Sequence, residues 1–190
     1  MPRFSIATRI VVLMQRTEFN LVSNTGHLIP KIFDNAEVRF RGAFDRQPLN
    51  TNGLDTPDRK TVVLFPTPDA TILSRDWITD VGKPLTLIVP DGNWRQASKM
   101  IKRVPALNQF TKIKIPEGRP SNYRLRTSPR SDGVCTFEAI ARTLGIIEGD
   151  AVQEAMENYF LTMVERVLWV RNKIKAEDVH GGLPEIKTWY

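Results

Sequence analysis

The sequence predicts a single α/β domain with a mostly parallel sheet flanked by helices. Short apolar, β-branched runs at residues 9–15, 61–65 and 85–89 are typical of strands buried on both faces. An amphipathic helical pattern follows the last run almost at once, over residues 93–104. Because strands alternate with crossover segments and 190 residues suffice for one core, we expect one domain over residues 1–175.

The first half of the chain alternates predicted strands with connections. After the strand at 9–15, residues 24–32 are expected to begin a short helix, with Asn24 or Thr25 near its cap; a cofactor contact is the alternative reading. Residues 36–42 alternate in polarity, as in a strand with one solvated face. Residues 45–60, rich in Asn, Asp, Pro and Gly, predict a long loop before the strand at 61–65.

A weak helix is expected over residues 69–78, before the strand at 85–89. In the helix at 93–104, apolar residues recur every three or four positions, and basic residues lie mostly between them. Asn93 can cap this helix and Pro105 ends it.

The region beyond the central helix begins with a strand and ends with a helix. Residues 111–115 alternate in polarity and predict an edge strand with outward lysines. Residues 117–133 are too poor in apolar side chains for a core and predict a loop. Residues 134–144 predict a helix that Gly145 ends.

Residues 150–175 predict a long amphipathic helix. Its apolar stripe indicates core packing, with a dimer seam as the alternative, so the protein is expected to be a monomer or a homodimer. The stripe consists of Val152, Met156, Tyr159, Phe160, Met163, Val167 and Val170. The tail at 176–190 is expected to be loosely ordered.

Composition narrows the possible classes of protein. No apolar run is long enough to span a bilayer, and the first residues lack a secretory signal, so a cytoplasmic protein is expected. A single cysteine, Cys135, excludes an internal disulfide and a multi-thiolate zinc site. His27 and His180 are isolated in the sequence. We interpret them as structural or surface residues, so no metal is expected.

Positive charge is concentrated in one segment. Residues 91–130 hold ten basic and two acidic residues, a net charge of +8, whereas the other 150 hold seventeen and nineteen, a net charge of −2. A solvated helix face is the ordinary explanation of such a run. Arg and Lys are also the residues that bind a polyanion backbone, and we therefore expect a nucleic-acid partner.

Asp91 and Gly92 lie where a strand's carboxyl end meets a helix's amino end, the usual ligand position in open α/β sheets. Asp91 is the only acidic residue between Asp80 and Glu117. A carboxylate at this place could accept a proton from a substrate, or it could help to cap the helix. Both roles remain open from residue chemistry alone.

Two ordered blocks carry a resemblance to a known family. Asp91-Gly92-Asn93-Trp94 is similar to the Asp-x-Thr-Trp signature of the DTW-domain family. The second block, Tyr123-Arg124-Leu125-Arg126, Pro129 and Cys135-Thr136-Phe137-Glu138-Ala139, resembles that family's Tyr-x-Leu-Arg, Pro and Ser-Thr-x-Glu-Ala pattern. The Asn-Thr-Gly at 24–26 and the Leu-Phe-Pro at 64–66 also occur in the family.

The resemblance implies an enzyme that transfers the aminocarboxypropyl group of S-adenosylmethionine to a uridine N3 of tRNA. It also implies a Rossmann-like fold related to SPOUT methyltransferases, in which the chain can be knotted. Asp91 would be the general base or would position uridine N3. The implied cofactor contacts are Phe65, Pro66, Pro90, Gly92, Trp94, Leu125, Thr136 and Glu138. The implied RNA contacts are Arg95, Lys99, Tyr123, Arg124, Arg126 and Arg130.

Several of these residues could have a different role. Trp94 could pack in the core, Thr136 could cap a helix, and the arginines could be surface charge. Glu138 could bind the methionine ammonium. The chain departs from the family pattern at Asn93, where the family has Thr, and at Cys135, where it usually has Ser and where we expect a small buried substitute, not a nucleophile.

Two further departures lie near the start of the chain. Arg16-Thr17 stands where the family often has His-Pro, and the amino-terminal cysteine cluster of many members is missing. Alternative functions are a methyltransferase, an rRNA aminocarboxypropyltransferase, or a non-catalytic RNA-binding module.

Overall fold

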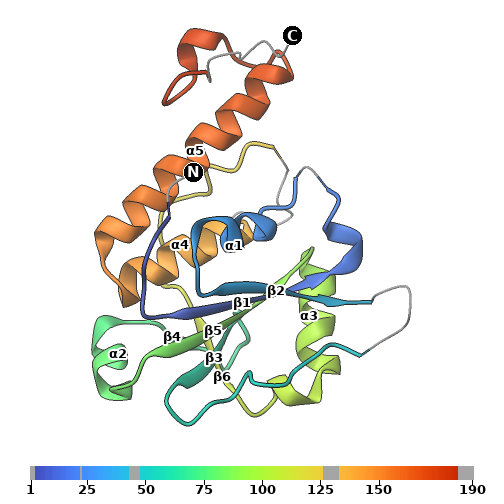
Figure 1. Ribbon diagram of the computed structural model, residues 1–190, viewed down its shortest axis with the longest axis vertical. Helices are drawn as coiled ribbons and strands as arrows, with labels where there is room; N and C mark the ends of the chain where they lie inside the picture. The colour runs from blue at the N-terminus through green and yellow to red at the C-terminus, as the bar shows by residue number, and fades with distance from the viewer. Residues whose placement is uncertain (1–2, 22, 43–47, 126–132, 184–190) are drawn as a thin grey trace.

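The computed structural model describes residues 3–21, 23–42, 48–125 and 133–183. Within these ranges the chain forms one parallel sheet of six strands, in the order β2-β1-β5-β3-β6-β4 (Figure 1). The strands are β1 (Arg9–Gln15), β2 (Ala36–Arg41), β3 (Lys60–Leu64), β4 (Thr71–Ile72), β5 (Leu85–Asp91) and β6 (Thr111–Lys114). The prediction of a single α/β domain with helices flanking a mostly parallel sheet is confirmed.

Helices cover both faces of the sheet. The α-helices are α1 (Ile29–Ile32), α2 (Arg75–Val81), α3 (Trp94–Arg103), α4 (Thr136–Ile147) and α5 (Asp150–Val170). Short 3₁₀ turns are η1 (Arg16–Glu18), η2 (Gly26–Leu28), η3 (Pro105–Leu107) and η4 (Ala176–Asp178). Because side chains alternate along a strand, Val12 of β1 faces one helical layer and Val11 faces the other.

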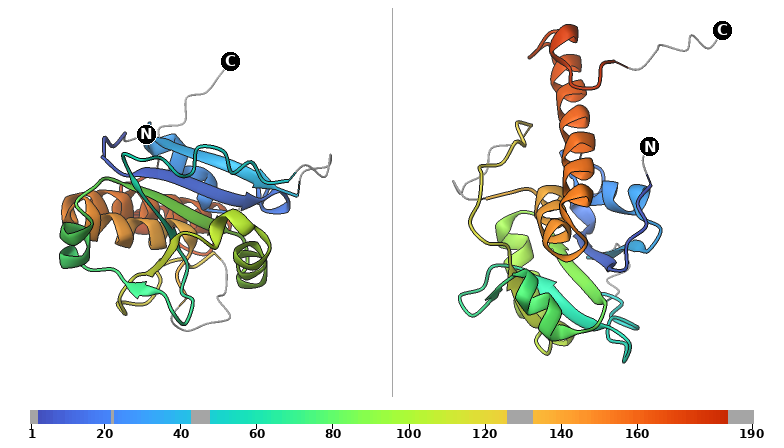
Figure 2. Two further views of the ribbon diagram at one scale, coloured as in Figure 1. Left: turned by 90° about the horizontal axis from the view of Figure 1, so that it is seen from below. Right: turned by 90° about the vertical axis from the view of Figure 1, so that its left-hand side faces the viewer.

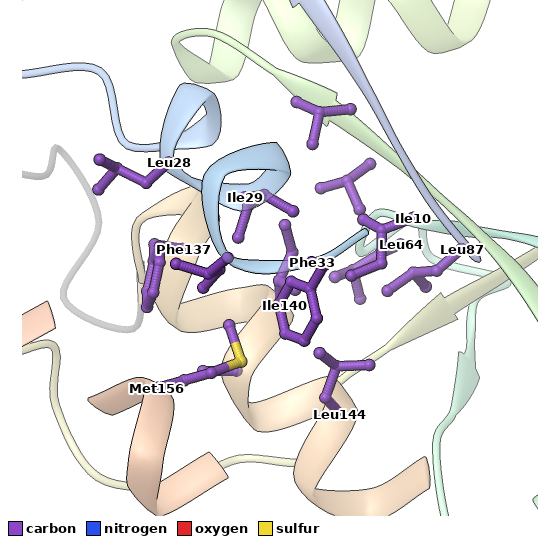
Figure 3. Packing of buried hydrophobic residues seen from close by; sticks show 14 of the residues in the cluster. Ile10, Leu28, Ile29, Phe33, Leu64, Leu87, Phe137, Ile140, Leu144 and Met156 are labelled. Carbon is purple, nitrogen blue, oxygen red and sulfur yellow. The ribbon is translucent and has the colours of Figure 1, made fainter. Parts of the chain in front are cut away.

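The larger core lies on the face covered by α1, α4 and α5. Ile10 and Leu87 of the sheet meet Phe33, Ile140 and Met156 there, and all five are fully buried or nearly so (Figure 3). Burying such a side chain contributes about 1.5–3 kcal/mol relative to leaving it exposed. This packing therefore fixes the beginning of α4 against the sheet.

The smaller core lies on the other face, under α3 and η3. Met100 and Ile101 of α3 pack on Val11, Leu13 and Ile88. Loop residues Leu49 and Leu54 complete the cluster, which explains how a segment without strand or helix stays attached to the sheet.

The predicted edge strand is not at the edge. β6 pairs with β3 on one side and with β4 on the other, so β4 is the edge strand. The predicted helix over 69–78 was also wrong in part, because β4 comes first and α2 begins only at Arg75, where the Trp77 N–H donates to the Ser74 hydroxyl. A two-residue strand is too short to give a pattern in the sequence.

Gly145 does not end α4 but lies inside it. The Gln153 side chain of α5 occupies the space that a Cβ at Gly145 would need, so the glycine lets the two helices approach closely. The helix continues to Ile147, and Gly149, with φ 114°, precedes α5.

The stripe on α5 is core only in part. Figure 2 shows that α5 extends beyond the sheet layer, and the buried residues follow the i, i+4 series Met156, Phe160, Val164 and Leu168. Val170, predicted to be core, is the last residue of α5 and is 70% exposed. The described part of the tail packs on the rest of the protein: Val179 is buried, and Arg166 Nε donates to the Gly182 carbonyl.

Candidate active site

Asp91 lies at the switch point of the sheet. The chain leaves β1 toward β2 through α1 on one face, whereas it leaves β5 toward β6 through α3 on the other face (Figure 1). β1 and β5 are neighbours, with Met14 opposite Asp91. In open α/β sheets such divergent connections leave a crevice at the carboxyl ends of the strands, where ligands bind.

The turn from β5 into α3 is built from three residues. Gly92 has φ 145°, which disfavours any residue with a Cβ, and a Cβ there would also lie 2.9 Å from Gln96 Oε1. Asn93 Oδ1 accepts from the Gln96 N–H at 2.9 Å, and Gln96 Oε1 accepts from the Asn93 N–H at 2.7 Å. The predicted cap at Asn93 is confirmed. Asp91 is therefore not needed to cap α3.

The Asp91 carboxyl group is enclosed by two segments distant in sequence. Asn24 Nδ2 donates to its Oδ2 at 2.6 Å, and the Thr136 hydroxyl donates to its Oδ1 at 2.5 Å. Gly26 lies against it so closely that a Cβ would be 2.9 Å from Asp91 Cγ. Asp91 is only 3% exposed, and its side chain is therefore held in one position.

Burial raises the pKa of Asp91 above its ordinary value, even though the hydrogen bonds from Thr136 and Asn24 oppose the rise. The nearby Glu18 carboxylate raises this pKa further, while His27 lowers it. Burial and the charge of Lys31 in turn lower the pKa of His27, which favours its neutral form. A carboxylate with a raised pKa is a stronger base than one in water.

The second motif fixes the surroundings of this carboxyl group. Glu138 is 4% exposed, and its oxygens accept from the Ser121 hydroxyl, the Asn122 N–H and the Cys135 N–H. The Tyr123 hydroxyl donates to the Ser23 carbonyl at 2.5 Å. The loop at 121–125 is thus fastened both to the start of α4 and to the residue before Asn24. This use of Glu138 favours a structural role over the binding of an ammonium group.

An aromatic pair lies beside the turn after β5. Phe65, directly after β3, and Trp94, the first residue of α3, have ring centroids 5.9 Å apart, and both are half-buried. Trp94 is therefore only partly withdrawn from solvent. Pro66 is exposed, whereas Pro90 is buried in β5 opposite Leu13.

The other residues predicted to contact cofactor or RNA are more scattered. Leu125 packs against the larger core. Arg95 and Lys99 are exposed on α3. Arg124 pairs with Glu165 of α5 at 2.7 Å. The last two predicted contacts, Arg126 and Arg130, lie outside the described residues.

Cys135 precedes α4, and burial raises the pKa of its thiol, which disfavours the nucleophilic thiolate. This agrees with the expectation of a small structural residue. Asn24, expected to cap a helix or to contact the cofactor, and Gly26, which was not predicted as a site residue, both contact Asp91. In the sequence, the resemblance of residues 24–26 to the Asn-Thr-Gly of the DTW family pointed to them.

Two cavities lie away from Asp91. One of about 460 Å³ is bordered by Arg119 and the first turns of α5, and one of about 300 Å³ lies at the amino ends of β1 and β2. Within the described ranges, no three His, Cys, Asp or Glu side chains are placed to hold a metal ion. No helix in the described part of the chain is long and apolar enough to cross a membrane.

Comparisons with known proteins show the family to which the chain belongs. A family model described as the DTW domain matches residues 1–168. The tRNA-uridine aminocarboxypropyltransferase 2 of Drosophila melanogaster is 32% identical over 95 residues, which are 50% of this chain and 36% of that protein. Its counterpart in Macaca fascicularis is 26% identical over 156 residues, 80% of this chain and 52% of that protein. The chain thus spans about half or less of the length of these relatives.

A solved structure supports the fold. The SAM-dependent rRNA:acp-transferase Tsr3 from Vulcanisaeta distributa superposes with a TM-score of 0.53 and 14% identity, covering 88% of this chain and 80% of that one. Fold and site together define a parallel α/β domain with a buried carboxylate at its switch point. The protein belongs to the DTW-domain family.

Proposed function

We propose that the protein transfers the 3-amino-3-carboxypropyl group of S-adenosylmethionine to N3 of a uridine in tRNA and releases methylthioadenosine, in the cytoplasm. Membership of the DTW family and the names of the similar proteins support this reaction. The observation that carries it is the enclosed Asp91 carboxyl group with its raised pKa, at the place where α/β sheets bind ligands.

Asp91 acts as the base. It accepts the N3 proton of uridine, and N3 then forms its bond to the methylene carbon as the carbon–sulfur bond breaks. S-adenosylmethionine supplies this carbon already activated by the sulfonium, so the protein contributes mainly placement and proton removal. Asn24 and Thr136 hold the carboxylate in line through one hydrogen bond to each oxygen.

The residues around the turn after β5 fit an adenosyl group. Phe65 and Trp94 present half-buried aromatic surface, and Gly92 adds no side chain of its own beside them. We assign these three, with Pro66, Pro90, Leu125 and Thr136, to the cofactor side of the site. Glu138 supports this side through the loop that it holds.

The RNA side is assigned to the basic face of α3. Arg95, Lys99, Lys102 and Arg103 are all exposed on this helix, which begins three residues after Asp91. Cations there can contact phosphates flanking the uridine, since phosphate contacts position a nucleic acid without reading its sequence. Tyr123, Arg124, Arg126 and Arg130 of the second motif are proposed as further contacts.

The test is the identity of the by-product. Purified protein is incubated with S-adenosylmethionine and tRNA, and both nucleosides and small molecules are analysed by mass spectrometry. We expect methylthioadenosine and aminocarboxypropyl-uridine. Adenosylhomocysteine would indicate methyl transfer instead. Modified uridine in a parallel reaction with rRNA, but not in tRNA, would show that rRNA is the substrate. Neither product, together with no binding of S-adenosylmethionine in calorimetry, would indicate a non-catalytic module.

A matched pair of variants tests the residue. Asp91→Asn should lower the rate about 10²- to 10⁴-fold, the usual contribution of a general base. Asp76→Asn, on an exposed turn of α2, should leave it unchanged. A near-normal rate in folded Asp91→Asn would remove Asp91 from the reaction. The relation to SPOUT enzymes, including a knot, is part of the same proposal and is tested by an experimental chain trace.

A further inference from the structure

An exposed aromatic surface lies beside the candidate active site. Phe19, directly after η1, is 46% exposed, and its ring stands edge-on to Phe40 of β2 with centroids 5.1 Å apart. The guanidinium of Arg16 lies 5.0 Å from the centre of the Phe40 ring. We call Arg16, Phe19 and Phe40 the aromatic shelf.

Strand register places the shelf near Asp91. Phe40 is opposite Met14, and Met14 is opposite Asp91, so the three residues form one row across β2, β1 and β5. Two strand spacings separate the backbones of Phe40 and Asp91 by roughly 10 Å. Figure 1 shows the segment after β1 (blue) at the end of the sheet where β1, β2 and β5 terminate.

The charges around the shelf fit a polyanion. On β2, Glu37 is paired with both Arg9 and Arg39. Beside Phe19 in the sequence, Glu18 is buried, whereas Arg16 is exposed and lies over the Phe40 ring, so the accessible charge next to the shelf is positive. An exposed ring beside a cation is the pattern of proteins that stack single-stranded bases, whereas a stable protein–protein interface requires a much larger surface.

We propose that the aromatic shelf stacks an unpaired nucleobase of the RNA substrate, adjacent in the strand to the uridine that reaches Asp91. This inference rests on the proposed function. Uridine N3 lies on the base-pairing edge, so the uridine must be unpaired and withdrawn from its stack before Asp91 can take its proton. The neighbouring base then loses a stacking partner, and the Phe19 ring replaces it.

The test compares tRNA affinities of four proteins at one salt concentration. Phe19→Ala should weaken tRNA binding by about 5- to 150-fold, the effect of removing one aromatic stacking partner. Phe19→Trp keeps the stacking surface and should bind within about threefold of wild type. Ile72→Ala removes a side chain that is 58% exposed on the distant edge strand β4 and should leave binding unchanged.

A photochemical measurement makes the test direct. tRNA transcribed with 5-iodouridine is irradiated in complex with the protein, and the crosslinked peptide is sequenced. We expect a crosslink at Phe19 in wild type. The shelf is overturned if Phe19→Ala binds tRNA as Ile72→Ala does, if Phe19→Trp is as weak as Phe19→Ala, or if wild type binds no tRNA.

The outcomes separate the shelf from the reaction. Phe19-dependent tRNA binding without any methylthioadenosine would support base stacking on the aromatic shelf and contradict the proposed transfer reaction. Release of methylthioadenosine, with a tRNA affinity that does not depend on Phe19, would contradict base stacking on the aromatic shelf and support the transfer reaction.

Discussion

Thr136, the first residue of α4, donates a 2.5 Å hydrogen bond to Oδ1 of Asp91, the last residue of β5. The two residues are 45 positions apart and meet because α4 packs its first turn against the carboxyl end of the central strand. The bond lowers the pKa of Asp91 against the larger upward effect of burial. Thr136 is thus the residue through which the second sequence motif acts on the first.

Replacing Thr136 by Val should move the acid side of the pH–rate profile. Without the hydroxyl donor, the carboxylate form of Asp91 is less stabilised, so its pKa rises and activity falls off at a higher pH than in wild type. The measurement is kcat/KM against pH. Thr136→Ser keeps the hydroxyl and should retain the wild-type profile. An unmoved or lowered midpoint in Thr136→Val would show that Asp91 does not titrate in the reaction.

Asp91→Asn should change the pH dependence of stability with a definite sign. The folded-state pKa of Asp91 lies above the ordinary value of 3.8, so between these two values the folded protein binds more protons than the unfolded chain. The contribution of Asp91 to the free energy of unfolding is therefore full below pH 3.8 and is lost as pH rises through the folded-state pKa.

The asparagine variant lacks this titration, and groups that do not interact with Asp91 cancel in the comparison. Its free energy of unfolding relative to wild type should therefore increase with pH across this window and then level off. Urea unfolding of both proteins at several pH values measures the difference. A difference that decreases with pH would mean that Asn24 and Thr136 stabilise the carboxylate more than burial destabilises it.

Gly26→Ala should disturb Asp91 directly. The added Cβ would lie 2.9 Å from Asp91 Cγ and 3.0 Å from Oδ2, closer than packed atoms allow, so the carboxyl group or the backbone of η2 must move. Overpacking of this kind costs about 1–3 kcal/mol. We expect a lower midpoint of urea unfolding together with a reduced transfer rate.

Gly118→Ala is the matched control for this change. The nearest atom to its added Cβ is 3.8 Å away, and stability should stay within about 0.5 kcal/mol of wild type. If Gly26→Ala behaved like Gly118→Ala in both stability and rate, the close contact with Asp91 would have no consequence.

Elements with strong local patterns could be predicted from the sequence. The boundaries of β1 and α3 agree with the predictions within a residue or so, because β-branched runs, an asparagine cap and Pro105 act locally. The position of Asp91 could also be predicted from the sequence, since a strand followed directly by a helix places the residues between them at the carboxyl end of the strand.

The parts that were not predicted depend on contacts between distant segments. The sequence around Gly145 does not show that Gln153 of α5 packs against it. Nor does the sequence show that β4 pairs with the edge of β6, since two residues are too few to show an alternating pattern. The bond from Asn24 to Asp91 joins residues 67 positions apart, and only the family's Asn-Thr-Gly pointed toward it.

Glu138→Gln should lower stability more than it lowers affinity for S-adenosylmethionine. The buried carboxylate accepts three hydrogen bonds, and a glutamine places an amide donor where one of its oxygens accepts from the Cys135 N–H or the Asn122 N–H. Leaving a buried donor unsatisfied costs about 1–3 kcal/mol, which urea unfolding measures. Glu154→Gln, exposed on α5, should change stability by less than about 0.5 kcal/mol.

The same variant separates the two roles considered for Glu138. If the carboxylate binds the methionine ammonium, the dissociation constant for S-adenosylmethionine should rise in calorimetry while the unfolding midpoint stays at the wild-type value. We expect the reverse, because both oxygens are already engaged by the protein's own donors. Loosening the loop at 121–125 should also free the Tyr123 hydroxyl from the Ser23 carbonyl, so any fall in transfer rate should accompany the fall in stability.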